Sequence, residues 1–223
     1  MHYAKRRSRK AFLRPLKNAN NIILIQELKK DGKMKAIINC ARNEREMYAD
    51  TRWRALPTHV PSTVFNTRVE DYKGDFEWEE VSTWDLFGGK RVLLFSLPGA
   101  FTPTCSTYQL PNFEKMAPEL KSKYNLDDIY CVSVNDSFVM NRWAKDNKLE
   151  HVKVIPDGSG KFTQDMDMNV NKDNLSFGER SWRYACIVHN GFITNWFIEE
   201  GKEDNCTEDP YHFTDPSFIY SNA

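Results

Sequence analysis

The feature that most constrains the fold of this 223-residue chain is a nearly continuous apolar run, Arg91-Val-Leu-Leu-Phe-Ser-Leu97, shortly after Gly88-Gly89. Such a run is typical of a strand that is buried on both faces of a sheet. We therefore place this strand at the centre of the sheet. The next apolar residues recur at helical spacing, which predicts an amphipathic helix that ends near Asn125 and is kinked at Pro111 and Pro118.

Strand and helix patterns alternate along the rest of the chain. Helical spacing covers residues 138–147, and strand patterns cover residues 63–69, 76–81, 129–134, 152–155, 184–188 and 192–198. The succession of strand, helix, strand, helix and strand predicts an α/β domain with largely parallel pairing. The first two and the last two strand patterns each predict an antiparallel hairpin, the second of them across Asn190-Gly191.

The formal net charge is zero, but its distribution divides the chain into two regions. Residues 1–58 carry 15 Lys and Arg against 5 Asp and Glu, whereas the remainder carries 16 against 26. We interpret residues 1–58 as a basic N-terminal extension, either disordered or a targeting segment, unless the protein starts nearer Met47. Residues 59–223 then form one folded domain. The basic region lacks an interleaved aromatic platform, so we expect no nucleic-acid partner.

Several classes of function are excluded by composition. The purely apolar runs, such as Ile22–Ile25, are far shorter than the roughly 20 residues that cross a bilayer, so no membrane span is expected. The five histidines show no metal-ligand spacing, and we expect neither a metal nor a nucleotide cofactor. Because the chain has no secretory signal and no Cys-x-x-Cys motif, we expect free thiols in a reducing compartment, the cytoplasm, with organelle targeting as the alternative.

The position of each cysteine separates the inert thiols from a reactive one. Cys131 and Cys186 lie inside apolar strands, where most cysteines are packing residues, and Cys40 lies in the basic extension. We assign these three no role. Cys105 instead lies in the short segment between the central strand and the next helix, and Cys206 lies in an acidic segment after the last strand.

The local sequence predicts that Cys105 lies at the start of a helix. Thr102 is a natural N-cap residue and Pro103 a natural first helical residue, so Cys105 is expected in the first helical turn. The unpaired N–H groups and partial positive charge of a helix start stabilise an anion. Since a thiol in such a place, beside a cation, ionises more readily than a free cysteine, we expect Cys105 to be a nucleophilic thiolate at neutral pH.

Four segments are highly specific when they are taken together: residues 95–106, 132–139, 155–158 and 177–184. They resemble the peroxiredoxins, and within them the type-five class, especially the peroxiredoxin modules of bacterial peroxiredoxin–glutaredoxin hybrids. The resemblance runs from about His59 to Tyr220. It implies a thioredoxin-like fold, with a mixed central sheet flanked by helices, and a homodimer. It also implies that hydrogen peroxide and organic hydroperoxides are reduced by a peroxidatic cysteine, which the match places at Cys105.

The same match places Pro98, Thr102 and Arg183 at the other active-site positions of the family. Thr102 can donate to the peroxide and accept from it, and Arg183 offers a fixed fork of donors with a permanent charge. Pro98 can shield the sulfur from water and slow oxidation past sulfenic acid. Arg180 is the alternative to Arg183, but the match to the residue directly before Tyr184 favours Arg183.

Oxidation would leave Cys105 as a sulfenic acid that a second thiol must reduce. Cys206 is the candidate resolving cysteine within the chain. Otherwise the reductant is an external thiol, such as glutathione with glutaredoxin, or thioredoxin, because no glutaredoxin module occurs in these 223 residues. The alternative function is a thioredoxin-fold redox sensor or holdase that uses the same cysteine. Only the enzyme would sustain turnover with excess thiol.

Overall fold

The computed structural model describes residues 13–18, 21–30, 33–41, 56–70, 73–74 and 76–223. The chain divides into two units, residues 1–54 and 55–223, which are described separately. In the first unit the backbone forms an antiparallel meander of β1 (Leu13–Asn18), β2 (Asn21–Lys30) and β3 (Lys33–Ala41). The prediction of a basic extension did not include these strands. The alternative start at Met47 lies outside the described residues.

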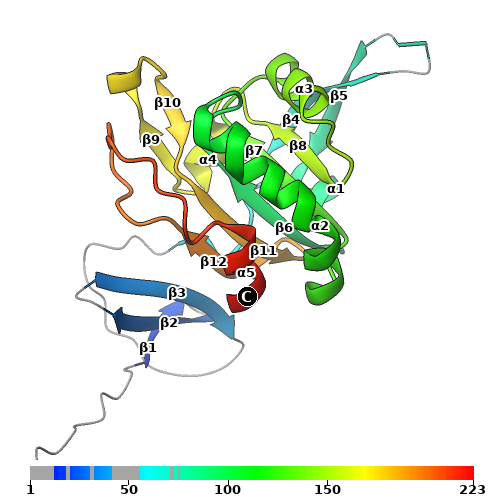
Figure 1. Ribbon diagram of the computed structural model, residues 1–223. Helices are drawn as coiled ribbons and strands as arrows, with labels where there is room; N and C mark the ends of the chain where they lie inside the picture. The colour runs from blue at the N-terminus through cyan, green and yellow to red at the C-terminus, as the bar shows by residue number, and fades with distance from the viewer. Residues whose placement is uncertain (1–12, 19–20, 31–32, 42–55, 71–72, 75) are drawn as a thin grey trace, which may run out of the picture. The chain divides into compact units, whose positions relative to one another are not determined.

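The second unit is built on a mixed sheet with the strand order β12-β11-β6-β7-β8 (Figure 1). Its strands are β6 (Arg91–Ser96), β7 (Asp128–Ser133), β8 (Val152–Pro156), β11 (Tyr184–His189) and β12 (Phe192–Ile198). Strands β6, β7 and β8 are parallel, and β11 is antiparallel to both of its neighbours. The structure confirms the predicted central strand, since β6 lies in the middle of the five.

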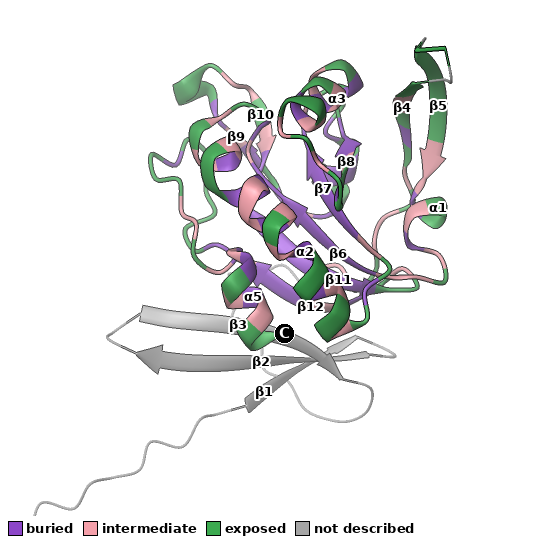
Figure 2. Cartoon of the chain, turned by 45° about the vertical axis from the view of Figure 1, so that its right-hand side comes forward, coloured by how far each residue is buried: buried purple, intermediate pink, exposed green. Residues whose placement is uncertain are grey.

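Successive side chains along each strand point to opposite faces of the sheet, and this alternation decides which residues pack against the helices. Leu93 and Phe95 of β6 belong to the core beneath α2 (Leu110–Tyr124), which also contains residues of α3 (Ser137–Asp146) and α5 (Pro216–Asn222). Tyr130 of β7 points to the opposite face and contacts Phe87 of α1 (Thr83–Phe87), with ring centroids 5.9 Å apart. Figure 2 shows the buried residues gathered in these central strands.

The predicted helix boundaries agree with local capping. Asp136 accepts a hydrogen bond from the backbone N–H of Val139 at 3.0 Å and starts α3. Asn125 ends α2 in the left-handed conformation, with φ of 51°. Pro111 is the second residue of α2 and directly follows the helical residues 103–110, and Pro118 lies inside α2. No helix in the described ranges is both long enough and apolar enough to span a bilayer.

Both predicted hairpins are present. Strands β4 (Val64–Glu70) and β5 (Phe76–Ser82) pair antiparallel, as do β11 and β12. Asn190 and Gly191 both have positive φ, 50° and 79°, as a tight two-residue turn requires. The smaller elements were not predicted: α4 (Lys161–Asp165), the 3-10 turn η2 (Asp173–Leu175) and the short antiparallel pair β9 (Asn169–Asn171) and β10 (Glu179–Ser181).

A stacked pair of rings joins the central strand to α2. Phe95 and Phe113 are fully buried, with ring centroids 3.8 Å apart and an interplanar angle of 8°. We expect Phe113→Ala to lower the free energy of unfolding by about 3–5 kcal/mol, because it removes buried surface and leaves a cavity. Urea titration would measure the loss. The matched control is Lys115→Ala, at an exposed position of the same helix, and a similar cost for both variants would contradict the prediction.

Candidate active site

The segment that carries Cys105 becomes helical where the sequence predicts. The chain is helical from Pro103, and the backbone N–H of Ser106 donates to the carbonyl of Thr102 at 2.9 Å. Thr102 therefore occupies the N-cap position of the backbone. Its hydroxyl does not cap the helix, however, because it donates to the carbonyl of Gly99 at 2.7 Å.

The first turn differs from the expected α-helical turn. Residues Cys105–Gln109 form a π-helical turn, η1, in which the N–H of Leu110 donates to the carbonyl of Cys105. Pro111 follows directly and gives a physical reason for the wide turn. Proline has no N–H, and its ring crowds the carbonyl four residues earlier, so an extra residue in the preceding turn relieves the crowding.

Cys105 and Arg183 meet in the interior of the molecule. Cys105 has no exposed surface, and the exposed fraction of Arg183 is 1%. One terminal nitrogen of Arg183, Nη1, lies 3.4 Å from the sulfur. Arg183 directly precedes β11 and shares the side-chain alternation of Ala185, a residue of the core beneath α2. The strand thus directs the guanidinium at the start of the helix.

Two further side chains hold the guanidinium, and sequence reasoning identified neither. Nη1 also donates to Oε1 of Gln109, and Nη2 pairs with Oδ1 of Asp209. Nε is buried with no hydrogen-bond partner among the described residues. Burial acts to lower the pKa of Arg183, but the sulfur of Cys105 and the carboxylate of Asp209 outweigh it and raise that pKa. The group is therefore a permanent cation.

The loop before the helix is fixed by an asparagine from the segment that follows β7. The N–H of Ala100 donates to Oδ1 of Asn135 at 2.9 Å, and the hydroxyl of Ser133 donates to the same oxygen at 2.7 Å. Asn135 belongs to one of the matched segments, but no role had been assigned to it. Pro98, the predicted shield, is half-buried at the start of this loop.

Phe101 occupies a strained backbone position beside the site. Its φ is 64°, a conformation that bulky residues rarely adopt and that costs about 1–3 kcal/mol. Its half-exposed ring lies 6.5 Å from that of Trp143, whose Nε1 donates to the hydroxyl of Ser106 at 3.0 Å. Trp143 of α3 therefore contacts the chain on both sides of Cys105, at Phe101 and at Ser106.

Arg180, the alternative cation, lies near the loop without reaching the sulfur in the described contacts. A Cβ atom added to Gly99 would lie 3.8 Å from its Nε. Its Nη1 donates to the carbonyl of Glu179, and its guanidinium lies 5.6 Å from the ring of Phe177. Burial lowers the pKa of Arg180.

The cysteines in the described side chains are all free thiols. Cys131 lies in the same core cluster as Cys105, and burial, followed by the charge of Cys105, raises its pKa well above the usual value. Burial also raises the pKa of Cys186. Cys206 is buried in a different cluster, against Val170 and Trp182. The side chain of Cys40 lies outside the description.

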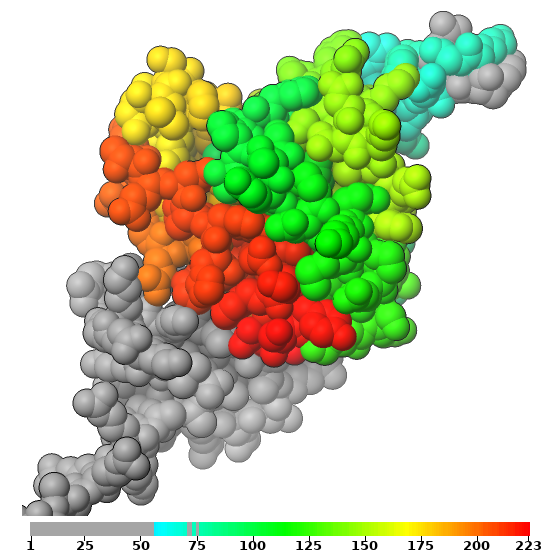
Figure 3. Space-filling model, viewed as in Figure 1, coloured from blue at the N-terminus to red at the C-terminus, as the bar shows by residue number. Residues whose placement is uncertain are grey.

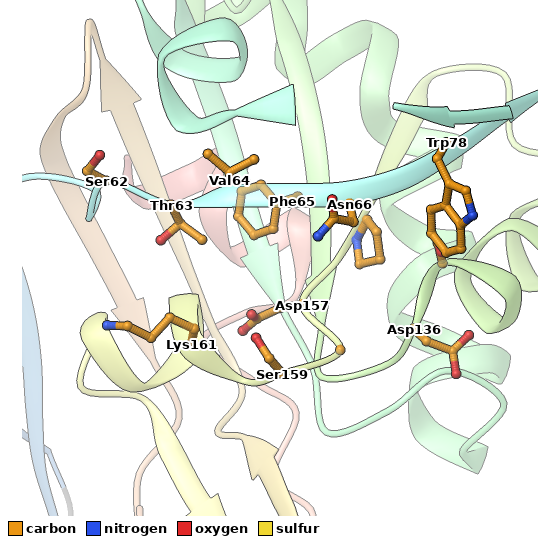
Figure 4. Close-up of a pocket in the computed structure, with 13 residues that line it drawn as sticks. Ser62, Thr63, Val64, Phe65, Asn66, Trp78, Asp136, Asp157, Ser159 and Lys161 are labelled. Carbon is orange, nitrogen blue, oxygen red and sulfur yellow. The ribbon is translucent and has the colours of Figure 1, made fainter. Parts of the chain in front are cut away.

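A groove elsewhere in the unit does not contain this chemistry. It has a volume of about 460 Å³ and lies between β4, the loop after β8 and the start of α3 (Figure 4). Burial raises the pKa of Asp157 in its wall, but both oxygens of this residue accept backbone N–H groups, from Phe162 and Thr163. No cysteine lines the groove. Within the described ranges, no group of three or more His, Cys, Asp or Glu could hold a metal ion.

Comparisons with known proteins agree on one family. The Redoxin family model matches residues 68–211. The chain is 57% identical over 168 residues to a peroxiredoxin of Rhizobium etli, which covers 74% of this chain and 93% of the relative. It is 49% identical over 156 residues to the hybrid peroxiredoxin hyPrx5 of Haemophilus influenzae, which covers 70% of this chain and 61% of the relative.

Solved structures give the same result. The antioxidant protein of Plasmodium falciparum, described as a 1-Cys peroxiredoxin, aligns with a TM-score of 0.70 and 34% identity over 73% of this chain and 96% of that one. Reduced Prx3 of Vibrio vulnificus in complex with hydrogen peroxide aligns with a TM-score of 0.64 and 31% identity, over 76% of this chain and 95% of that one.

The contact between Gln109 and Arg183 can be tested by stability. Gln109→Met keeps the length of the side chain but removes the acceptor from a buried, charged donor, so we expect the free energy of unfolding to fall by about 1–3 kcal/mol. Gln109→Glu retains an acceptor and should lose less. Thr107→Ala, at an exposed position of the same turn, is the control in urea titrations. Equal stability of Gln109→Met and this control would contradict the assignment.

Proposed function

Because the chain belongs to the peroxiredoxin family, we propose that it is a member of the type-five class, which the hybrid relative resembles, and that Cys105 is its peroxidatic cysteine. Peroxiredoxins are thiol-dependent peroxidases, and the Redoxin match together with the mixed sheet confirms the predicted thioredoxin-like fold. One observation carries the assignment of the residue. Cys105 is the thiol whose sulfur lies 3.4 Å from a buried arginine nitrogen, and a neighbouring cation favours the thiolate, which is the nucleophilic form.

The chemistry requires an in-line displacement at the peroxide. The thiolate sulfur of Cys105 attacks one oxygen, so that the S–O bond forms as the O–O bond breaks. The sulfur is oxidised to sulfenic acid, and the peroxide is reduced to an alkoxide or hydroxide that takes up a proton to leave as alcohol or water. The site must therefore stabilise negative charge as it moves from the sulfur to the departing oxygen.

The contacts favour distinct roles for the other predicted residues. The hydroxyl hydrogen of Thr102 is already donated to Gly99, so we propose that its oxygen accepts the O–H of the peroxide instead of serving as both donor and acceptor. Arg183 holds a permanent charge and an unpartnered Nε–H, which suits an oxygen that is gaining charge. Pro98 would exclude water from the sulfur.

We propose that an external thiol, glutathione with glutaredoxin or thioredoxin, regenerates Cys105. Cys206 packs beside Trp182, in a cluster apart from the one that contains Cys105, and this burial does not favour rapid thiol exchange. The hybrid relative and the structure described as a 1-Cys peroxiredoxin are compatible with this route. The homodimer, the cytoplasmic location and the division of the chain near residue 58 stay predictions.

The role of Cys105 is tested by Cys105→Ser, which we expect to reduce peroxide consumption to the background rate, because a neutral hydroxyl cannot replace the thiolate. Arg183→Lys keeps the charge but loses the planar fork, and should lower the rate by about 10²-fold. The assay follows peroxide with excess thiol. The control is Cys186→Ser, on the opposite face of the sheet. Oxidation of Cys105 without turnover would indicate a redox sensor, and undiminished activity of Cys105→Ser would refute the assignment.

The route of regeneration is tested by intact mass after one equivalent of peroxide, with and without glutathione. We expect a glutathione adduct on Cys105 when glutathione is present, because the other cysteines whose side chains are described are all buried. Loss of two hydrogens without glutathione would instead show an internal disulfide and contradict the external route. Cys206→Ser would then decide whether Cys206 is the resolving residue, since the loss of two hydrogens should disappear in that variant.

A further inference from the structure

We propose that Asp209 is a positioning residue for the reaction: its carboxylate fixes the guanidinium of Arg183 against the sulfur of Cys105 and opposes the positive charge there. The inference rests on the proposed function, since it takes Cys105 as the peroxidatic cysteine. Asp209 belongs to the segment of residues 199–215, here called the C-terminal strap, which joins β12 to α5. Figure 3 shows this part of the chain, in orange and red, on the surface beside the green α2.

The C-terminal strap is anchored to the rest of the unit, so Asp209 is held in place. At its first residue, the carbonyl of the buried Glu199 accepts Nε1 of Trp182 at 2.8 Å, and Oε1 of Glu199 ties the two ends of the strap together by accepting the backbone N–H groups of His212 and Thr214, each at 2.8 Å. In its middle, the carbonyl of Cys206 accepts Nζ of the buried Lys172 at 2.8 Å. A side chain on such a segment can orient a partner, which one on a loose loop cannot do.

The contacts of Arg183 divide between its two terminal nitrogens. Nη1 donates to the sulfur of Cys105 and to Gln109, while Nη2 pairs with Asp209. Because the guanidinium is planar, holding both nitrogens prevents the group from turning away from the sulfur. The ring of Tyr211, two residues beyond Asp209, lies 5.8 Å from the central carbon of the guanidinium and covers it.

The ion pair between Arg183 and Asp209 joins a buried side chain to an exposed one, and this difference affects how much the pair contributes to stability. Arg183 is buried, with 1% of its side chain exposed, whereas 49% of the Asp209 side chain is exposed. A buried cation needs a partner charge, and loss of that partner is costly. An ion pair between two exposed side chains would contribute little. The burial of Arg183 sets this pair apart from such surface pairs.

The charge of Asp209 should also affect the ionisation of the thiol. The titratable and charged groups around Cys105 and Arg183 are Cys131 from β7, and Asp209 and Tyr211 from the C-terminal strap. Burial raises the pKa of both Cys131 and Tyr211, so these two groups stay neutral at physiological pH. Removing the negative charge of Asp209 leaves the charge of Arg183 less opposed, and the thiolate should then form at lower pH.

Three variants of the full chain distinguish the effect of Asp209 on the position of Arg183 from the effect of its negative charge. Asp209→Asn retains an acceptor but loses the charge, Asp209→Ala loses both, and Asp209→Glu retains both. The matched control is Glu208→Gln, which removes the same charge from the exposed neighbouring residue. Two quantities are measured: the rate constant for oxidation of Cys105 by hydrogen peroxide, and the pH profile for alkylation of the Cys105 peptide by iodoacetamide.

We expect Asp209→Ala to lower the rate constant by about tenfold, the scale on which loss of an orienting partner reduces activity. Asp209→Asn should lose less rate, but its alkylation profile should shift to lower pH, as should that of Asp209→Ala. Asp209→Glu and Glu208→Gln should retain the profile of the unmodified protein. A merely structural role would lower the stability to urea without moving the pH profile.

The outcomes distinguish this inference from the proposed function. If Cys105→Ser still consumes peroxide, the proposed function is wrong. If Cys105→Ser is inactive while both Asp209→Asn and Asp209→Ala match Glu208→Gln in rate and pH profile, only the role of Asp209 is overturned. A loss of rate with an unchanged pH profile and lowered stability would also overturn it. Should Asp209→Ala fail to fold, Asp209→Asn alone decides through its pH profile.

Discussion

The buried charge of Arg183 is the constraint on which the arrangement of the site depends. A cation with 1% of its side chain exposed is tolerated only when an opposite charge compensates it and most of its donors are paired. Its partners come from parts of the chain far apart in sequence: Cys105 and Gln109 from the helix start, and Asp209 from the C-terminal strap. The guanidinium that would stabilise a thiolate therefore also links the start of β11 to the π-helical turn η1 and to the C-terminal strap.

The core explains why these elements meet at that point. Strand β6 ends immediately before the loop that leads to the helical turn of Cys105, and the Phe95–Phe113 stack fixes α2 over the strand. Side-chain alternation then decides the face, because Arg183, Ala185 and Ile187 repeat every second residue. A shift of β11 by one residue would move Arg183 to the face opposite α2. The register of a hydrophobic strand therefore determines where the cation lies.

Strands and turns with a strong local hydrophobic or turn pattern could be predicted from the sequence. The site residues that were missed are held by contacts with residues far away in the chain. The apolar runs of β6, β7 and β11 and the Asn190-Gly191 turn are read directly from neighbouring residues. Arg183 was assigned from its match to a family motif, since 78 residues separate it from Cys105. Asp209 lies among other acidic residues and nothing nearby marks it. Only Gln109, one turn after Cys105 and two residues before Pro111, had a local signal for its inward position.

Burial of the sulfur limits which reagents this conformation admits. Cys105 has no exposed surface, so a reagent can reach the sulfur only when residues around it move, and these include the loop and helix start that Asn135 and α3 hold in place. Hydrogen peroxide has two heavy atoms, whereas glutathione is a tripeptide whose sulfur must approach in line with the S–O bond of the sulfenic acid. Access for the small oxidant and access for the larger reductant are therefore different requirements. Because the sulfur is fully buried, both require local movement, and the larger reductant requires the larger displacement of the helix start or its supporting loop.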